Sequence, residues 1–224
     1  MAPFSQSGSL PQAVVFDFDG VVVDSEPVHY RAFQAVLEPL GLGFGWERYM
    51  AEFIGYDDRD GFRAAYAHAG LAEPRGQDLD DLVTAKTEAF EREAASGLPV
   101  FEGVEALVRS LADAGIPLAV CSGALRGEIT PTLDRLGLRR VFAALVSAED
   151  VARSKPDPES YARAVAELAR ATGRDLVPTS CAAIEDTPAG IASARGAGLA
   201  VLAVAHTHPE EALSEAQLIR QRLA

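Results

Sequence analysis

The chain has few cysteines and no long apolar run. Its 224 residues include only two cysteines, Cys121 and Cys181, and each lies near the end of an apolar run. Thiols in such places are typically buried and reduced, so the sequence offers no disulfide framework and no cysteine metal site. No apolar run approaches the roughly 20 residues that a helix needs to cross a bilayer. We therefore expect a protein that does not enter the membrane.

Positive charge is also scarce, because 20 lysines and arginines stand against 33 acidic residues and the formal net charge is −13. This balance argues against nucleic acid as a partner, since binding a polyanion requires a basic surface. It does not oppose a small phosphorylated ligand. Residues 1–12 lack the basic and apolar segments of a signal peptide. We expect a cytoplasmic protein that is a monomer or a weak homo-oligomer.

The most informative segment covers residues 14–25. Its apolar start, Val14 to Phe16, is typical of a parallel strand that is covered on both faces. Asp17 and Asp19 follow where the strand should end, and alternation places both side chains on one side, while Gly20 permits a sharp turn. Two carboxylates on one side repel each other unless a cation lies between them. A hard divalent cation is the simplest such cation, and ligands bind at the carboxyl ends of strands in open α/β sheets.

The pattern of apolar residues changes twice along the chain and predicts two domains. Helical stripes without a convincing strand occupy residues 26–40, 46–53, 59–69 and 79–93. From residue 101 onward, helices alternate with short apolar strands. We predict an α/β core of residues 1–22 and 97–224, and an inserted helical domain of residues 23–96.

The core is predicted to be a doubly wound parallel sheet of five strands with helices on both faces and right-handed crossovers. The residues after Pro209 are predicted to be helical. Polar groups follow the predicted strands, and parallel strands bring their carboxyl ends to one edge of a sheet. The groups expected to meet there are Asp17, Asp19, Ser122, Lys155, Glu185 and Asp186.

This set of groups suits phosphoryl transfer, which uses carboxylates for a metal, a hydroxyl and backbone N–H groups for phosphate oxygens, and a lysine to offset charge. The nucleotide-binding pattern G-x-x-x-x-G-K-[ST] does not occur. If phosphate is transferred here, the protein itself can therefore be the acceptor, and a carboxylate is a known nucleophile for this step.

Four motifs in order resemble those of one family. D-x-D-G-x-x-x-D-[ST] covers residues 17–25, and Ser122-Gly123, Lys155-Pro156 and Glu185-Asp186-Thr187-Pro188-Ala189-Gly190 follow. With these motifs the chain resembles the haloacid dehalogenase superfamily, and within it the phosphatases and mutases that are similar to β-phosphoglucomutase. A lone Asp-x-Asp-Gly would indicate no more than a capped turn, but four ordered motifs over nearly the whole chain are specific.

The resemblance implies a role for each acidic residue. Asp17 would attack phosphorus and form an aspartyl-phosphate, and Asp19 would protonate the leaving oxygen and then activate water. Magnesium would be held by Asp17, the backbone carbonyl of Asp19 and Asp186, with Glu185 beside or within the coordination shell. A carboxylate next to the metal and a lysine is expected to stay ionised at neutral pH.

The resemblance also implies that Ser122, Gly123 and Lys155 bind the phosphate and that the helical domain is a cap that closes over the core.

His29 is either a partly buried polar group of a helix or a hinge residue near the substrate. Arg59 follows two aspartates in a stretch that is either solvated helix-entry charge or a loop that reads the substrate, and the resemblance favours the loop. His206 and His208 lack a third partner, so a loop is expected there and not a metal site.

Departures from the mutases point to the reaction. Those mutases carry lysines at the positions of Ile54 and Leu125, and an arginine where Asp58 stands next to Arg59. Fewer cations would weaken the hold on a bisphosphorylated intermediate. The expected function is a Mg²⁺-dependent phosphatase acting on a small phosphomonoester, with a sugar phosphate as the expected class. The alternatives are a hexose-phosphate mutase and a non-enzymatic phospho-receiver or binding module.

Overall fold

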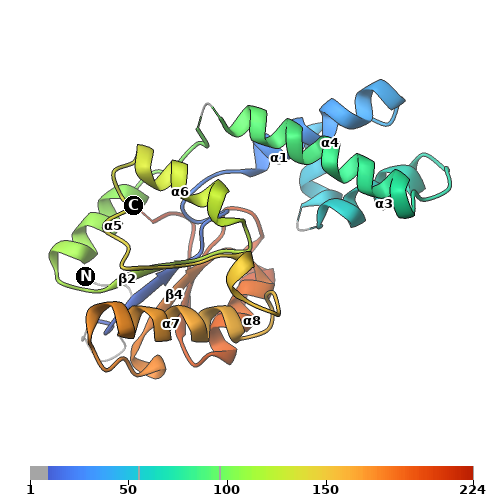
Figure 1. Cartoon of the computed structure of the whole chain (residues 1–224). Helices are drawn as coiled ribbons and strands as arrows, with labels where there is room; N and C mark the ends of the chain where they lie inside the picture. The colour runs from blue at the N-terminus through green and yellow to red at the C-terminus, as the bar shows by residue number, and fades with distance from the viewer. Residues whose placement is uncertain (1–9, 55, 96, 224) are drawn as a thin grey trace. The chain divides into compact units, whose positions relative to one another are not determined.

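The computed structural model describes residues 10–54, 56–95 and 97–223 (Figure 1). The chain divides into two compact units, one comprising residues up to Asp24 and from Pro99 onward, the other Ser25–Leu98. We call them the α/β unit and the helical unit. Within the described residues, no helix is both long enough and apolar enough to cross a bilayer.

A six-stranded parallel sheet forms the centre of the α/β unit, with the strand order β3-β2-β1-β4-β5-β6. The first strand lies between two others, and its Val14 is paired with Leu118 on one side and Ala182 on the other. The predicted doubly wound α/β fold is confirmed. The strands are β1 Val14–Phe16, β2 Leu118–Cys121, β3 Ala144–Val146, β4 Ala182–Glu185, β5 Ala200–Val204 and β6 Leu218–Arg220.

Helices cover both faces of this sheet. Figure 1 shows α7 and α8 on one side of it and α5 and α6 on the other. Alternate strand residues such as Val15 and Ala183 pack with Tyr161 and Leu168 of α7 in one buried cluster. Every residue of β1, β2 and β4 is buried, which explains why these strands are continuously apolar up to their ends. The helices are α5 Val104–Asp113, α6 Arg126–Arg135, α7 Glu159–Thr172 and α8 Pro188–Gly196.

The end of the chain differs from the prediction. The residues after Pro209 form a short 3₁₀ turn, Glu210–Leu213, and then strand β6, so the predicted C-terminal helix and the count of five strands were wrong. Tertiary contacts decide this segment: β6 pairs with β5, and Ile219 packs against the buried cluster under the sheet. Polar residues, Gln217 and Arg220, flank the two apolar residues of β6, so this partly exposed strand lacks the apolar run that marks the equally short β1.

The helical unit contains no strand within its described residues, as the sequence predicts. Aromatic residues dominate its core, where Phe33, Tyr49 and Phe53 are all buried. The first predicted helix ends as expected near Gly41, which adopts the left-handed conformation with φ of 72°. The elements are α1 Glu26–Leu37, a 3₁₀ turn Glu38–Leu40, α2 Trp46–Arg48, a π-helical turn Tyr49–Phe53, α3 Asp58–His68 and α4 Gly76–Ala94.

Candidate active site

The end of β1 places two aspartates beside the neighbouring strands. Asp17 continues the ladder, because its backbone N–H donates to the Ile184 carbonyl at 3.0 Å, and its side chain is buried. After Asp19 the chain turns at Gly20, whose φ is 76°. A Cβ on Gly20 would lie 1.9 Å from Asp186 Oδ2, so only glycine fits this turn.

Lys155 joins the ends of β1 and β4. Its Nζ atom lies 2.9 Å from Asp17 Oδ1 and 2.6 Å from Glu185 Oε1, and it also donates to the Cys121 carbonyl at 3.2 Å. Burial alone would lower the pKa of this lysine, but the charges of Asp17 and Glu185 outweigh burial and hold the pKa well above its usual value. Lys155 is therefore a buried cation at neutral pH.

Glu185 is fully buried and its two carboxylate oxygens are well supplied with donors. Oε1 accepts hydrogen bonds from Lys155 and from the Tyr161 hydroxyl at 2.8 Å. Oε2 accepts from the backbone N–H of Asp186 at 3.0 Å and from the hydroxyl of Thr187 at 3.1 Å. Such bonds stabilise a buried carboxylate, and here they supply donors to both oxygens of Glu185.

Asp186, unlike Glu185, has a hydrogen-bond donor on only one of its two carboxylate oxygens among the described residues. Its Oδ2 atom accepts a hydrogen bond from the Thr207 hydroxyl. Its Oδ1 atom is buried and, among the residues that the structure describes, has no hydrogen-bond partner. A buried carboxylate oxygen without a partner is costly, and a bound cation would satisfy it.

The arrangement of charges fits a divalent cation. Oxygens of Asp17, Glu185 and Asp186 lie within 4.8 Å of one another. The three carboxylates and the single positive charge of Lys155 together have a formal net charge of −2. Without a cation, burial and the charge of Glu185 raise the pKa of Asp17 to about 7, and burial and Asp17 raise the pKa of Asp186. The ionised Asp17 expected from the sequence thus depends on a cation as well as on the lysine.

Ser122 follows β2 and lies beside the second aspartate. Its hydroxyl donates to Asp19 Oδ2 at 3.3 Å and accepts from the Ala124 N–H at 2.9 Å. Gly123 has open space where a Cβ would lie, so sterics do not require glycine at this position. The structure therefore brings together the six residues that were expected to converge from the strand ends.

His206 and His208 belong to the loop after β5. The Nδ1 atom of His206 lies 2.8 Å from the Gly20 carbonyl oxygen, and its ring stacks on Phe101 with centroids 3.9 Å apart. His208 Nδ1 lies 3.0 Å from the Thr207 hydroxyl. Neither histidine belongs to the group of metal-binding candidates found among the described residues, and the packing of His206 fits the expected loop.

The other two candidate residues belong to the helical unit. His29 stacks on Phe90, and its Nδ1 atom lies 2.8 Å from the Nζ atom of Lys86. Burial, and then the charge of Lys86, lower the pKa of His29 to about 3, so its ring is neutral at physiological pH. Arg59 is half exposed and forms an ion pair with Asp80.

Sequence reasoning missed Lys86, Tyr161 and Thr207. The side chain of Lys86 is only 3% exposed and also pairs with Asp58 at 2.6 Å. One signal could have found it, because Lys86 falls on the same face of its helix as the buried Leu79. In the sequence, Tyr161 has the pattern of an ordinary core aromatic residue and Thr207 that of an ordinary loop residue.

Comparisons with known proteins show the family of the chain. A family model described as haloacid dehalogenase-like hydrolase matches residues 14–204. The protein CbbY of Rhodobacter capsulatus is 30% identical over 199 residues, which cover 85% of this chain and 84% of that protein. The fructose-1-phosphate phosphatase YqaB of Escherichia coli is 31% identical over 191 residues, covering 83% and 92%.

A solved structure of CbbY from Rhodobacter sphaeroides in complex with xylulose-(1,5)bisphosphate is also similar. It has a TM-score of 0.77 and 26% sequence identity, and the match covers 96% of each chain. The family model covers the sheet from β1 to β5 and the six residues that meet at the strand ends. The chain therefore belongs to the haloacid dehalogenase-like hydrolases, as its motifs predict.

Proposed function

We propose that the chain is a Mg²⁺-dependent phosphatase that hydrolyses a small sugar phosphate through an aspartyl-phosphate on Asp17. The observation that carries this proposal is the buried contact of Lys155 with Asp17 and Glu185. Lys155 holds one oxygen of Asp17, and a carboxylate has a second oxygen with which to attack. The lysine also supplies positive charge where the phosphoryl oxygens would lie.

The reaction needs two proton transfers, which we assign to Asp19. In the first half, Asp17 displaces the sugar oxygen from phosphorus and Asp19 gives that oxygen a proton. In the second half, Asp19 takes a proton from water, the water oxygen bonds to phosphorus, and the bond between phosphorus and the Asp17 oxygen breaks, which frees phosphate and the Asp17 carboxylate. The hydrogen bond from Ser122 to Asp19 orients this carboxylate. A magnesium ion on Asp17, Asp186 and the Asp19 carbonyl, with Glu185 adjacent, would offset the charge of the phosphoryl group.

The substrate class rests on the relatives and on the helical unit. YqaB is named for fructose 1-phosphate, and CbbY was solved with a sugar bisphosphate. We propose that the helical unit is the cap and that His29 and Arg59 take part in substrate recognition. The expected partner is a small phosphorylated metabolite, with no nucleic acid, in the cytoplasm.

One contact counts against a mutase. A mutase must hold a second phosphate, and the helical unit contains the buried Lys86. Asp58 already pairs with this lysine at 2.6 Å, and it occupies the position where the mutases carry an arginine. A carboxylate there opposes a second phosphate, and this favours hydrolysis over transfer between two sugar positions.

The proposal is tested by phosphate release from a panel of sugar monophosphates with and without Mg²⁺. Wild type should release phosphate only with the metal, and Asp17→Asn should be inactive. Asp113→Asn, at an exposed position of the same unit, is the matched control and should behave as wild type. Equal rates for wild type and Asp17→Asn would refute the nucleophile. Sugar-phosphate isomers formed only with added bisphosphate would show the mutase instead.

The intermediate can be tested separately. Asp19→Asn should slow the second half of the reaction more than the first when the leaving group needs no proton, as with p-nitrophenyl phosphate. Intact-mass measurement should then find one phosphoryl group on the protein, and Asp17→Asn in the same background should abolish it. An Asp19→Asn enzyme that turns over normally without carrying phosphate would contradict the role of Asp19.

A further inference from the structure

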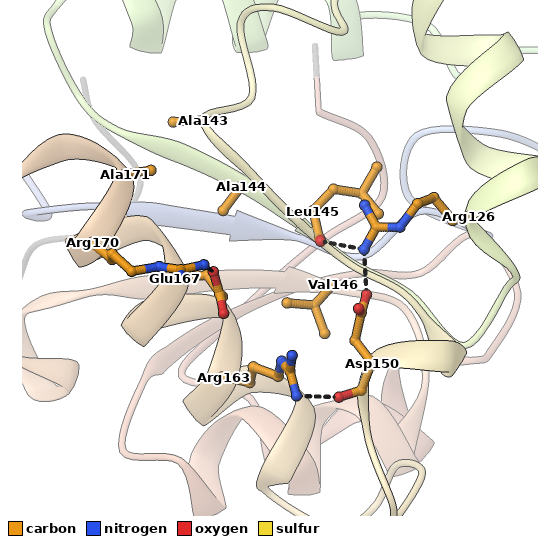
Figure 2. Close-up of a pocket in the computed structure, with 10 residues that line it drawn as sticks. All are labelled: Arg126, Ala143, Ala144, Leu145, Val146, Asp150, Arg163, Glu167, Arg170 and Ala171. Atoms are coloured by element: carbon orange, nitrogen blue, oxygen red, sulfur yellow. Dashed lines mark hydrogen bonds and ion pairs between the residues drawn. The ribbon is translucent and has the colours of Figure 1, made fainter.

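A polar cavity lies at the β3 edge of the sheet, and its lining residues differ from those of the candidate active site. It has a volume of about 520 Å³ and is lined by β3, α7 and the start of α6, as Figure 2 shows. Small-molecule pockets typically measure roughly 300–1,000 Å³. None of its lining residues belongs to the group around Asp17, so this cavity is not a part of that site.

The cavity is rich in arginine, although the chain is strongly acidic. Three guanidinium groups, from Arg126, Arg163 and Arg170, line it together with two carboxylates, those of Asp150 and Glu167. The lining therefore has a net positive charge in a chain whose formal net charge is −13. A local excess of positive charge within a concave surface attracts anions.

Two of the arginines are held in place by one residue. Arg126 Nη2 lies 2.5 Å from Asp150 Oδ2, and Arg163 Nη1 donates to the backbone carbonyl of Asp150 at 2.5 Å. Asp150 is fixed in turn by Ser147. The Asp150 carboxylate accepts hydrogen bonds from the backbone N–H and from the hydroxyl of Ser147, both at 2.8 Å. The two guanidinium groups, which come from different helices, thus keep a set spacing before any ligand binds.

These contacts leave donor capacity on both arginines. A guanidinium has five N–H donors, and the hydrogen bonds described use two on Arg126 at most and one on Arg163. Within the part of the chain that the structure describes, Arg163 forms no ion pair with a carboxylate. In Figure 2 its remaining nitrogens point toward Val146 and the cavity.

The part of the cavity wall formed by β3 is apolar. Ala144, Leu145 and Val146 of β3 form part of the wall, so a short apolar or ring portion can lie beside the charged group. Arg126 Nη2 donates to the Leu145 carbonyl at 3.2 Å and so occupies the edge of this strand. That contact opposes addition of a peptide strand and favours a small molecule.

We infer that this cavity binds a small organic anion, with a phosphate or carboxylate group held between Arg126 and Arg163. Paired guanidinium groups suit both anions because each presents parallel N–H donors to two oxygens. The site is independent of the proposed phosphatase activity.

Site-resolved NMR of the full chain tests the inference with two probes, inorganic phosphate and malonate. Saturable shifts of the β3 amides and of the Arg163 Nε–H signal are expected for at least one probe, and the tighter probe identifies the preferred anion. Phosphate bound at the candidate active site is read separately from the Asp186 amide, which donates to Glu185 Oε2. Shifts confined to Asp186, or no saturable shift at β3, would overturn the proposal.

Variants make the test specific. Arg163→Gln and Arg126→Gln should each weaken binding at β3 by about tenfold or more. Arg109→Gln is the matched control. The side chains of Arg109 and Arg126 are 47% and 42% exposed, and each forms an ion pair with a carboxylate. Arg109→Gln should leave the affinity unchanged. If Arg109→Gln weakened anion binding at β3 equally, the effect would come from the net charge of the chain, and a defined site would be refuted. Amide spectra of all three variants show whether they are folded.

Discussion

The Tyr161 hydroxyl offers a direct measure of how strongly the buried acid at the end of β4 depends on its donors. Tyr161 is fully buried, and its hydroxyl donates to Glu185 Oε1 at 2.8 Å. Tyr161→Phe keeps the ring in the core and removes only this donor. Glu185 itself is 0% exposed, so water cannot replace the lost bond without a rearrangement.

The magnitude follows from the charge of the acceptor. A hydrogen bond to a charged group contributes about 1.5–3 kcal/mol to stability. For a chain of this size, each kcal/mol changes the Tm by about 2–4 °C. Tyr161→Phe should therefore lower the Tm by about 3–12 °C, and urea unfolding should show a lower midpoint with an unchanged m-value.

Tyr56→Phe is the matched control, because Tyr56 is 51% exposed and loses the same hydroxyl atom. Its free energy of unfolding should stay within about 0.5 kcal/mol of wild type. A Tyr161→Phe protein as stable as Tyr56→Phe would refute the reasoning. It would show that Lys155 and the Thr187 hydroxyl satisfy Glu185 without the tyrosine.

Three further changes test other parts of the structure. Thr207→Val removes the hydroxyl that donates to Asp186 Oδ2, and should weaken Mg²⁺ binding about 10- to 100-fold by calorimetry, because partners that orient metal ligands have effects of this size. Gly190→Ala would place a Cβ 1.8 Å from Glu185 Oε1 and should lower both the Tm and the phosphatase rate. His29 should show no titration between pH 8 and pH 5 by NMR, because its native pKa is about 3. Since the unfolded value is about 6.5, the native state binds fewer protons below that pH, and His29 should make the protein less stable as the pH falls toward 3.

Each of these has an internal control. Thr207→Ser keeps the hydroxyl and should recover Mg²⁺ affinity, and equal affinity in the valine and serine variants would contradict the role of the hydrogen bond. Gly127→Ala, at a helical position with open space around its Cβ, should not destabilise the chain. A His29 signal that titrates near pH 6.5 would show that its ring is solvated.

The sequence predicted the site where local pattern and topology were enough. Asp17, Ser122 and Glu185 each end an apolar strand, and parallel pairing brings such ends together. Tyr161 and Thr207 could not be found in this way, because their hydroxyls act through the packing of α7 and of the loop after β5. A buried tyrosine in an amphipathic helix has the same pattern whether or not its hydroxyl meets a carboxylate.

The helical elements were predicted because their apolar periodicity is long, whereas β6 is partly exposed and has no continuous apolar run. The stretch 46–53 was predicted as one helix, but it begins as α2 and continues as a π-helical turn. Tyr49 and Phe53 are both buried in this turn, so packing of the aromatic core accompanies the change in winding. Periodicity within eight residues does not distinguish the two kinds of winding.

The arginine contact at β3 has a consequence for the solution behaviour of the chain. An open sheet ends in two strands whose outer backbone groups invite pairing with another molecule, and here these strands are β3 and β6. Arg126 covers a carbonyl of β3, and β6 ends at the exposed Arg220. Both outer strands are only three residues long and have an arginine nearby, so the sheets of two molecules gain little by joining. By covering the Leu145 carbonyl, Arg126 thus also discourages aggregation through the β3 edge of the sheet.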